Sequence, residues 1–383
     1  MSKVVLGIDR LDEVINLFDG KRVGIVTNPT GVNSEFVSTI DLFYKNTNLV
    51  ALYSPEHGVR GNIQAGEKVE TYIDEATGVK VYTLYGKSKR PSKDMLDDID
   101  ILVIDIQDVG SRLYTYLYTM AYCMQACKDY GKEVVVFDRP NPVGGVEVEG
   151  NLVKEGFTSF VGLYPIPYRY GLTMGELAHY FNNEFQINAQ LTVVTMKNWK
   201  RDMYYDETEL PWIMPSPNMP TIDTTILYNA TCIFEGTNIS EGRGTTKPFE
   251  IVGAPWLDAN LLAQTLNAIG LGGVYFQPIY FSPTFSKHEG VLCQGVQIHI
   301  LDRNNIKPVK IALHLLKHII LQNEHEFEFS APYTQKGKPM IDYNTGSDIV
   351  RLTDFDPDTL YEEWEHENET YKHIKQQYHL YST

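Results

Sequence analysis

The chain has 383 residues, of which 43% are hydrophobic, and a formal net charge of −16. This length exceeds what one compact core usually holds, so we expect two globular domains. The acidic balance argues against nucleic acids and anionic membrane surfaces as partners. The sequence contains no apolar run of the ~20 residues that a membrane span needs and no signal-peptide pattern. We therefore expect a cytoplasmic protein, or a secreted or periplasmic one if a leader was removed.

Four short apolar runs in the first 140 residues have the pattern of buried parallel strands. They cover residues 22–26, 49–53, 99–104 and 133–137. Helical stretches lie between them, around residues 37–44 and 114–128, and this alternation predicts a doubly wound parallel sheet. Because the carboxyl ends of parallel strands meet at one edge, the polar residues that follow the strands should line one pocket.

The polar residues after these strands are the first site candidates. They are Asn28, Glu56, His57, Arg60, Gln107, Asp108, Arg112, Asp138, Arg139 and Asn141. Charged side chains packed into turns that contain glycine are costly to bury unless they serve a site. The alternative for Glu56 is a simple polar turn in which it caps the next element.

A proline-rich passage at residues 211–220 is the predicted boundary between a domain of residues 1–212 and a domain of residues 213–383. Before it, Thr173 and Glu176 form a capping-box pattern that opens a helix. The remaining predicted elements are a strand at 191–196, strands of a smaller mixed sheet at 276–281 and 295–301, and helices at 311–321 and 356–378. In the last helix, Leu360, Trp364, Tyr371 and Ile374 are expected on the buried side, opposite a solvated acidic face.

Two kinds of metal site can be considered, a carboxylate site and a cysteine site. Asp105, Asp108 and Asp138 beside Glu56 have the composition of a Mg²⁺ or Ca²⁺ cage. Against this, Arg112 and Arg139 follow the aspartates closely and would neutralise them. Four cysteines (Cys123, Cys127, Cys232 and Cys293) lack zinc-site spacing, and we expect them to be reduced core residues.

No cofactor is expected. The first strand-to-helix turn lacks the Gly-x-Gly-x-x-Gly pattern, and the sequence contains no Walker loop and no Gly-x-Ser-x-Gly elbow. Tyr114, Tyr116, Tyr118 and the segment around Arg169 add aromatic rings, which suit a carbohydrate but are equally consistent with ordinary packing. The residues alone therefore indicate a hydrolase or binder of a polar, sugar-like ligand that we expect to be anionic.

Several long strings together resemble one family. They are Ser-Pro-Glu-His-Gly-Val-Arg-Gly at 54–61, Asp-Ile-Gln-Asp-Val-Gly-Ser-Arg-Leu-Tyr-Thr-Tyr at 105–116, Asp-Arg-Pro-Asn-Pro at 138–142, Pro-Ser-Pro-Asn-Met-Pro at 215–220 and Glu-Gly-Thr-Asn-Ile-Ser-Glu-Gly-Arg-Gly-Thr-Thr-Lys-Pro-Phe-Glu at 235–250. The sequence is similar in these strings to bacterial exo-β-N-acetylmuramidases of the NamZ type.

This resemblance implies a Rossmann-like domain, a smaller C-terminal α+β domain and an active site in the cleft between them. It implies release of β-1,4-linked N-acetylmuramic acid from non-reducing ends of peptidoglycan fragments, with MurNAc-GlcNAc oligosaccharides as partners. The proposed catalytic glutamate of the family maps onto Glu56. Many members carry a secretion signal, which this sequence lacks.

The second half of the sequence is expected to complete the site. Its candidates are Asn218, Glu235, Asn238, Glu241 and Arg243, with Glu241 as a second carboxyl function because glycines beside it permit close approach of a ligand. The lactyl carboxylate of N-acetylmuramate needs a cation, and the candidates are Arg60, Arg112, Arg139, Arg169 and Arg243. Two alternatives stay open, a non-catalytic muropeptide-binding protein and a metal-dependent hydrolase that uses the aspartates.

Overall fold

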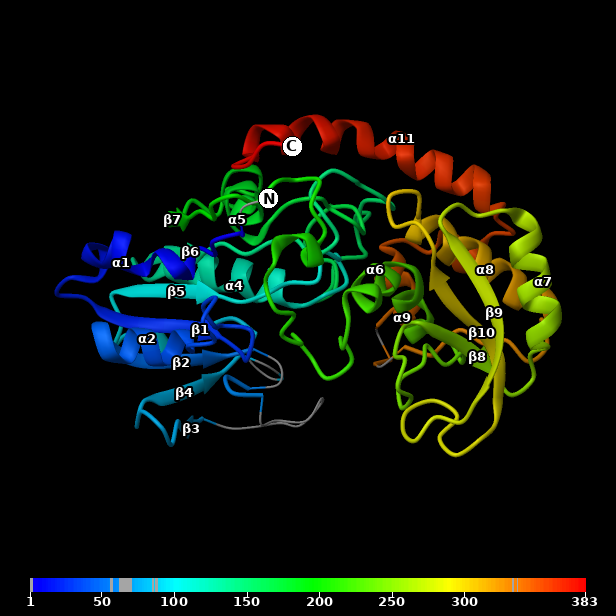
Figure 1. The fold of residues 1–383 in the computed structure, drawn as a ribbon, viewed down its shortest axis with the longest axis horizontal. Helices are drawn as coiled ribbons and strands as arrows, with labels where there is room; N and C mark the ends of the chain where they lie inside the picture. The colour runs from blue at the N-terminus through cyan, green and yellow to red at the C-terminus, as the bar shows by residue number, and fades with distance from the viewer. Residues whose placement is uncertain are drawn as a thin grey trace.

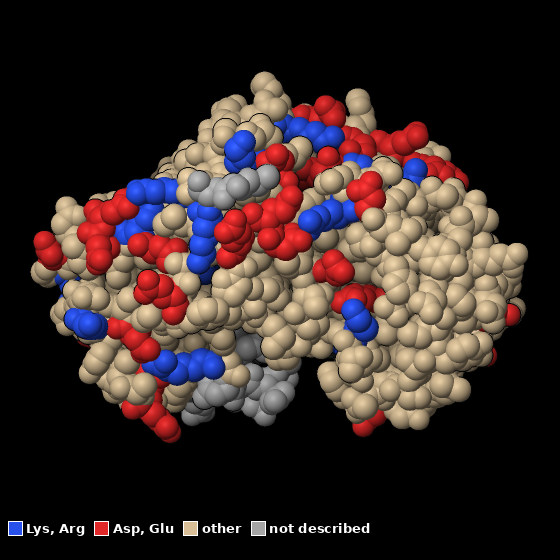
Figure 2. All heavy atoms as spheres, viewed as in Figure 1, with Lys and Arg blue, Asp and Glu red and all other residues tan. Residues whose placement is uncertain are grey.

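The computed structural model describes residues 3–55, 58–61, 71–84, 86, 89–332, 334–335 and 337–383. These residues form two lobes, each built around its own β-sheet, and a long C-terminal helix lies across both (Figure 1). Figure 2 shows charged side chains over the first lobe and near that helix, whereas the visible face of the second lobe is mostly uncharged. The sequence agrees, because residues 259–286 contain no Asp, Glu, Lys or Arg.

The first lobe contains a seven-stranded sheet in the order β3-β4-β2-β1-β5-β6-β7. Its strands are β1 (Arg22–Thr27), β2 (Asn48–Ser54), β3 (Tyr72–Ile73), β4 (Lys80–Thr83), β5 (Ile101–Asp105), β6 (Glu133–Phe137) and β7 (Gln190–Val194). All neighbours pair in parallel except β3, which runs antiparallel to β4 at the edge. The six parallel strands have the Rossmann order, and the order reverses between β1 and β5.

Alternate residues of each central strand enter two separate cores, one on each face of the sheet. In β5, Leu102 and Ile104 belong to the larger core, whereas Ile101 and Val103 belong to the smaller one. Helices cover both faces, which is why these strands are apolar on both sides. The predicted doubly wound parallel sheet is confirmed.

The helices of the first lobe divide between those two cores. Residues of α1 (Leu11–Val14) and α2 (Thr39–Asn46) enter the smaller core, and residues of α3 (Lys93–Leu96), α4 (Tyr116–Asp129) and α5 (Met174–Glu184) enter the larger one. The predicted capping box at the start of α5 is confirmed, with both reciprocal hydrogen bonds between Thr173 and Glu176 present. Short 3-10 helices are η1 (Ile8–Arg10), η2 (Ile15–Phe18) and η3 (Tyr205–Thr208).

The second lobe has a three-stranded antiparallel sheet in the order β8-β10-β9. Its elements are η4 (Cys232–Gly236), β8 (Ile251–Ala254), β9 (Val274–Phe281), β10 (Cys293–Ile300), α6 (Ile222–Thr231), α7 (Ala259–Ile269), α8 (Pro308–Gln322), α9 (Met340–Thr345) and α10 (Ile349–Leu352). The predicted smaller α+β unit is present, but its sheet is antiparallel and not mixed as expected. The boundary that we place between residues 212 and 213 lies in the loop before α6 and stays a prediction.

Helix α11 (Pro357–Lys375) leads back from the second lobe to the first and continues into η5 (Gln376–Tyr378) (Figure 1). The Asn368 side chain donates to the Gly150 carbonyl, and the Tyr371 hydroxyl donates to the Tyr170 carbonyl. As predicted, Leu360, Trp364 and Tyr371 are buried, and Ile374 is partly buried.

The remaining expectations concern the cysteines, membrane-spanning helices and the elements that were not predicted. The four cysteines are free and buried, as expected. In the described part of the chain, no helix is long and apolar enough to cross a membrane. Among the elements that were not predicted from the sequence are β4, α6, α7 and β8, which are short or lack a clear polar and apolar alternation.

Candidate active site

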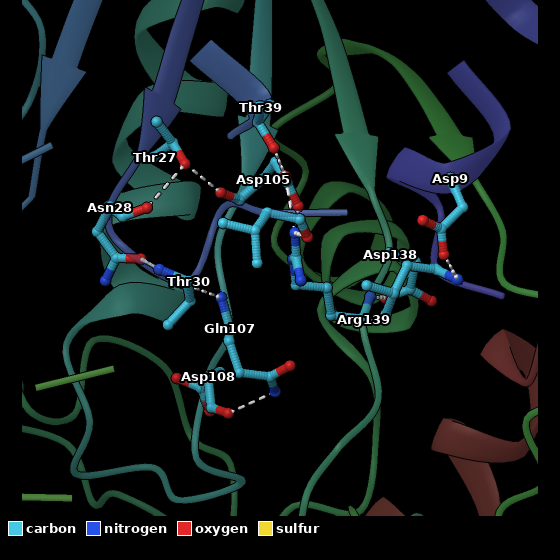
Figure 3. A network of polar contacts seen from close by, with 12 residues as sticks. Asp9, Thr27, Asn28, Thr30, Thr39, Asp105, Gln107, Asp108, Asp138 and Arg139 are labelled. Carbon is cyan, nitrogen blue, oxygen red and sulfur yellow. Dashed lines mark hydrogen bonds and ion pairs between the residues drawn. The ribbon is translucent and has the colours of Figure 1, made fainter. Parts of the chain in front are cut away.

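The loops that follow β1 and β5 are joined at the point where the strand order reverses (Figure 3). The Thr27 hydroxyl donates to the Asp105 carbonyl at 2.8 Å, and the Thr30 hydroxyl accepts the Gln107 amide at 2.9 Å. The Gln107 side chain donates to two further carbonyls, those of Asp108 and Pro140. Hydrogen bonds within the protein therefore join the two loops at the edge where many Rossmann-like sheets bind a ligand.

Asp105 and Arg139 form a buried bidentate pair at this edge (Figure 3), with Nε–Oδ1 at 2.6 Å and Nη2–Oδ2 at 2.9 Å. The two side chains are 0% and 3% exposed. Arg139 also donates to the Val32 carbonyl, and the Thr39 hydroxyl donates to Asp105. The expected neutralisation of the aspartates by arginine is confirmed for Arg139, which pairs with Asp105 and not with its sequence neighbour Asp138.

Arg112 does not neutralise an aspartate, contrary to the expectation. Its guanidinium lies over the Tyr168 ring and donates to the carbonyls of Asn151, Ile166 and Asn344. The reason is the direction of the side chain. Arg112 reaches α9 of the second lobe, where its guanidinium binds a backbone carbonyl and not a carboxylate. Arg112 therefore joins the two lobes.

Asp108 and Asp138 are also held within the protein. Asp108 accepts the Tyr170 hydroxyl and the Gly110 amide, and burial raises its pKa to about 7. Asp138 accepts the Thr173 hydroxyl, the Gly175 amide and the Tyr381 hydroxyl, and burial raises its pKa to about 6. Among the described residues, no three His, Cys, Asp or Glu side chains lie together as a metal site.

The proline-rich segment docks onto the end of β1. The Pro215 carbonyl accepts the Tyr116 hydroxyl at 2.6 Å and the Asn28 side-chain amide at 3.3 Å. The Asn28 amide also donates to the Tyr116 hydroxyl at 2.9 Å. These hydrogen bonds bring residue 215 to the sheet edge, although Asn28 and Tyr116 were predicted as ligand residues. Asn218, three residues further on, is half-buried.

Asn141 and Arg169 lie deeper and bind backbone. The Asn141 side chain donates to the Leu172 carbonyl and accepts the Val143 amide. Arg169, 3% exposed, donates to the Val143 carbonyl and pairs with Glu149 at 3.5 Å. These residues stabilise the loops behind the sheet edge.

Glu56 and His57 lie outside the described residues, so the separation of Glu56 and Glu241 is not described. The residues that flank them, Pro55 and Gly58, are buried. Gly61 has a φ of +73°, and a Cβ there would lie 2.6 Å from the Pro29 ring. The loop after β2 therefore runs beside the loop after β1, at the same edge of the sheet.

Arg60 turns away from that edge. Its guanidinium pairs with Asp74 at 2.6 Å and with Asp41 at 3.3 Å. These partners belong to the β3–β4 connection and to α2, so Arg60 joins the outer part of the sheet to a helix.

A second group of charged side chains lies in the second lobe. This charge cluster consists of Glu235, Glu241, Arg243 and Lys287. Glu241 is 2% exposed and contacts Arg243 at 3.3 Å and Lys287 at 2.8 Å, while Arg243 also pairs with Glu235 at 2.6 Å. The cations are 28% and 24% exposed, so solvent reaches them although it does not reach Glu241.

Lys287 was missed by the sequence analysis because it lies 46 positions from Glu241 in a connection without a recognised motif. Asn238, by contrast, was predicted as a ligand residue and mainly holds backbone. Its side chain donates to the Glu326 carbonyl and accepts the Glu328 amide. It fixes the segment that carries the charge cluster.

Aromatic rings connect the sheet edge with the charge cluster. Tyr114 contacts Tyr116 and Tyr228, with centroid distances of 4.8 and 5.9 Å, and Tyr228 contacts Phe249 at 4.7 Å. The Arg243 guanidinium lies 5.0 Å from the Phe249 ring. Tyr116 is 1% exposed, like the other tyrosines near the edge, which are Tyr118, Tyr168 and Tyr170 at 0–1%. These rings were interpreted either as carbohydrate-binding groups or as ordinary packing. Ordinary packing describes them, because the protein covers their faces.

Comparisons with known proteins match both lobes to one family. The family model described as exo-β-N-acetylmuramidase NamZ, N-terminal, matches residues 23–223, and the C-terminal model matches residues 226–381. The peptidoglycan β-N-acetylmuramidase NamZ of Bacillus subtilis (strain 168) is 54% identical over 330 residues, which is 85% of this chain and 80% of the relative.

Two crystal structures of DUF1343 family proteins from Bacteroides fragilis have the same fold. The first has a TM-score of 0.91 and 38% identity, covering 99% of both chains. The second has a TM-score of 0.79 and 30% identity, covering 100% of this chain and 99% of the other.

Proposed function

The chain belongs to the NamZ family of exo-β-N-acetylmuramidases, and from this membership we propose how it cleaves its substrate. It is a glycosidase that acts on peptidoglycan. In our proposal it releases β-1,4-linked N-acetylmuramic acid from the non-reducing ends of peptidoglycan fragments. The substrates are MurNAc-GlcNAc oligosaccharides, bound between the loop after β2 and the charge cluster.

Glu56 is the general acid of this proposal, and His57 lies next to it in the chain. The supporting observation is the course of the loop after β2, which has buried residues at both Pro55 and Gly58. A general acid must be protonated near neutral pH, and burial of a carboxyl group favours that form. The proton goes to the glycosidic oxygen as the bond to the leaving sugar breaks.

Glu241 is the second carboxyl group. Glycoside cleavage uses either two carboxyl groups or one carboxyl group with help from the substrate. Gly242 and Gly244 flank this part of the loop with φ of +83° and +80°, and a Cβ at either position would lie within 2.7 Å of a backbone oxygen. The loop therefore needs glycine to bring Glu241 and Arg243 into their positions.

Arg243 is the proposed partner of the lactyl carboxylate. Of the five candidate arginines, Arg112, Arg139 and Arg169 are at most 3% exposed, and Arg60 pairs with Asp41 and Asp74 of the first lobe, outside the charge cluster. Arg243 is partly exposed and belongs to the charge cluster. A charge-assisted contact from its guanidinium distinguishes N-acetylmuramate from N-acetylglucosamine, which lacks the lactyl group.

The test is turnover of a chromogenic β-N-acetylmuramide by the parent and by Glu56→Gln, each with and without a chelator. The amide keeps the shape of the side chain but cannot supply the proton, so we expect a loss of ~10²-fold or more. Near-parental turnover of folded Glu56→Gln would remove Glu56 from the mechanism. Binding without turnover by the parent would indicate a muropeptide-binding protein, and loss on chelation would indicate a metal-dependent hydrolase.

A further inference from the structure

Lys287 lies in the connection between β9 and β10 and joins three acceptors of one segment. Its ammonium group donates to the Phe234 carbonyl at 2.5 Å, the Ile239 carbonyl at 2.8 Å and Glu241 Oε2 at 2.8 Å. An ammonium group has three N–H donors, so all of them are used. The three acceptors fix the chain where η4 ends and the loop to Glu241 begins.

The connection that carries Lys287 is itself firmly anchored. The Thr284 amide and hydroxyl both donate to the Gly244 carbonyl, at 2.8 and 2.9 Å. His288 Nε2 contacts the Asn238 carbonyl at 2.7 Å. The backbone on either side of Lys287 is strained, with φ of +73° at Ser286 and +58° at His288. Such conformations persist only where surrounding contacts hold them.

We infer that Lys287 is a positioning residue for the reaction: it orients Glu241 and, through it, Arg243. One carboxylate oxygen of Glu241 binds Lys287 and the other contacts Arg243. The nearly buried carboxylate of Glu241 therefore links the position of the Lys287 ammonium group to that of the Arg243 guanidinium. Lys287 has no donor left for substrate, so it acts on the reaction through the groups that it holds, and of these Glu241 is the one that contacts Arg243.

This inference rests on the proposed role of Glu241 and adds a residue from another part of the chain. The strained connection brings the ammonium group of Lys287 to three acceptors that lie 46 to 53 positions earlier in the sequence.

The test is a double-mutant cycle between Lys287→Met and Glu241→Gln, with kcat and KM measured on the chromogenic muramide. Each single variant should lose at least 10-fold in kcat/KM, and the double variant should lose no more than Glu241→Gln alone. Lys247→Met is the matched control, because Lys247 also pairs with a buried glutamate of the second lobe, Glu250, at 2.7 Å. We expect it to keep parental kcat/KM.

Three outcomes would overturn the inference. If Glu241→Gln is impaired while folded Lys287→Met is parental, the role of Lys287 alone is wrong. If the losses multiply in the double variant, Lys287 acts independently of Glu241. If Glu241→Gln is parental, the proposed role of Glu241 fails, and the role of Lys287 fails with it.

A second variant covers the case in which Lys287→Met does not fold. Lys287→Arg keeps the charge, but a planar guanidinium cannot meet three acceptors arranged for an ammonium group. We expect a parental melting temperature and at least a fivefold lower kcat/KM. Parental kcat/KM in folded Lys287→Arg would contradict the inference.

Discussion

The carboxyl edge of the first sheet and the charge cluster of the second lobe use the same residue types in different ways. At the sheet edge, Asp105 and Arg139 are 0% and 3% exposed, and each has its partners within the protein. In the charge cluster, a buried Glu241 is flanked by Arg243 and Lys287, which solvent reaches. The enclosed pair at the sheet edge thus holds the fold, whereas the partly exposed Arg243 of the charge cluster remains available to a ligand.

The largest effect that this contrast predicts is on stability, at Arg139. Arg139→Ala leaves the carboxylate of Asp105 buried without its cation, which costs about 3–5 kcal/mol in the free energy of unfolding. Urea unfolding measures this loss. Arg22→Ala removes a pair with Asp100 in which both side chains are exposed, at 42% and 40%, and should change the unfolding midpoint little. Equal midpoints for Arg139→Ala and the parent would show that the pair does not hold the edge.

The next effect is on selectivity, at Arg243. A charge-assisted bidentate contact is worth on the order of 1.5–3 kcal/mol, so Arg243→Ala should lose roughly tenfold to hundredfold of the preference for muramide over glucosaminide. The preference is the ratio of kcat/KM for the two chromogenic substrates. Arg351→Ala is the control, because Arg351 has similar exposure and also pairs with a buried carboxylate, Asp342. An unchanged ratio in Arg243→Ala would assign the lactyl group to other donors.

The last effect is the pH dependence of stability due to Asp108. Burial raises the pKa of this carboxyl group to about 7, above the value of ~3.9 in an unfolded chain. Between these values the folded state binds more protons than the unfolded state, so stability falls as pH rises from about 4 to about 7. The slope is at most about 1.4 kcal/mol per pH unit for this group.

Asp108→Asn removes that contribution, because an amide does not titrate. The free energy of unfolding of the variant should therefore fall less between pH 5 and pH 7 than that of the parent. Urea titrations at several pH values measure the two slopes. Parallel slopes would mean that Asp108 does not bind its proton more tightly in the folded state.

Much of the fold was predictable because its signal is local. The central strands are continuous apolar runs, and the start of α5 is set by a four-residue capping pattern. Strand β4 was missed because Lys80–Thr83 near the edge of the sheet has a short, mixed pattern. Helix α7 was missed although it has an N-cap at Asp258 and a Gly270 in left-handed conformation, because no charged residues mark its outer face.

The site was harder to predict, because the type of a residue does not show whether its side chain is buried. From the sequence alone, the candidate cations Arg60, Arg112, Arg139, Arg169 and Arg243 were equivalent. The structure separates them by their acceptors, such as Asn344 for Arg112, Glu149 for Arg169 and Glu235 for Arg243. Asn344 lies 232 positions from Arg112 in the chain. Lys287 could not be predicted for the same reason, since its acceptors become neighbours only after β9 and β10 have paired.

The hydrogen bond between Tyr381 and Asp138 has a consequence for the order of synthesis. The two residues lie 243 positions apart, and the Tyr381 hydroxyl also accepts the Met196 amide. Ribosomes deliver the amino-terminal part first, and domains usually fold as they emerge. Here the buried carboxylate at the end of β6 receives its last donor only after Tyr381 has been synthesised, 243 residues later. A nascent chain that stops short of Tyr381 therefore carries a first lobe that has assembled its sheet but still lacks the final contacts at its edge.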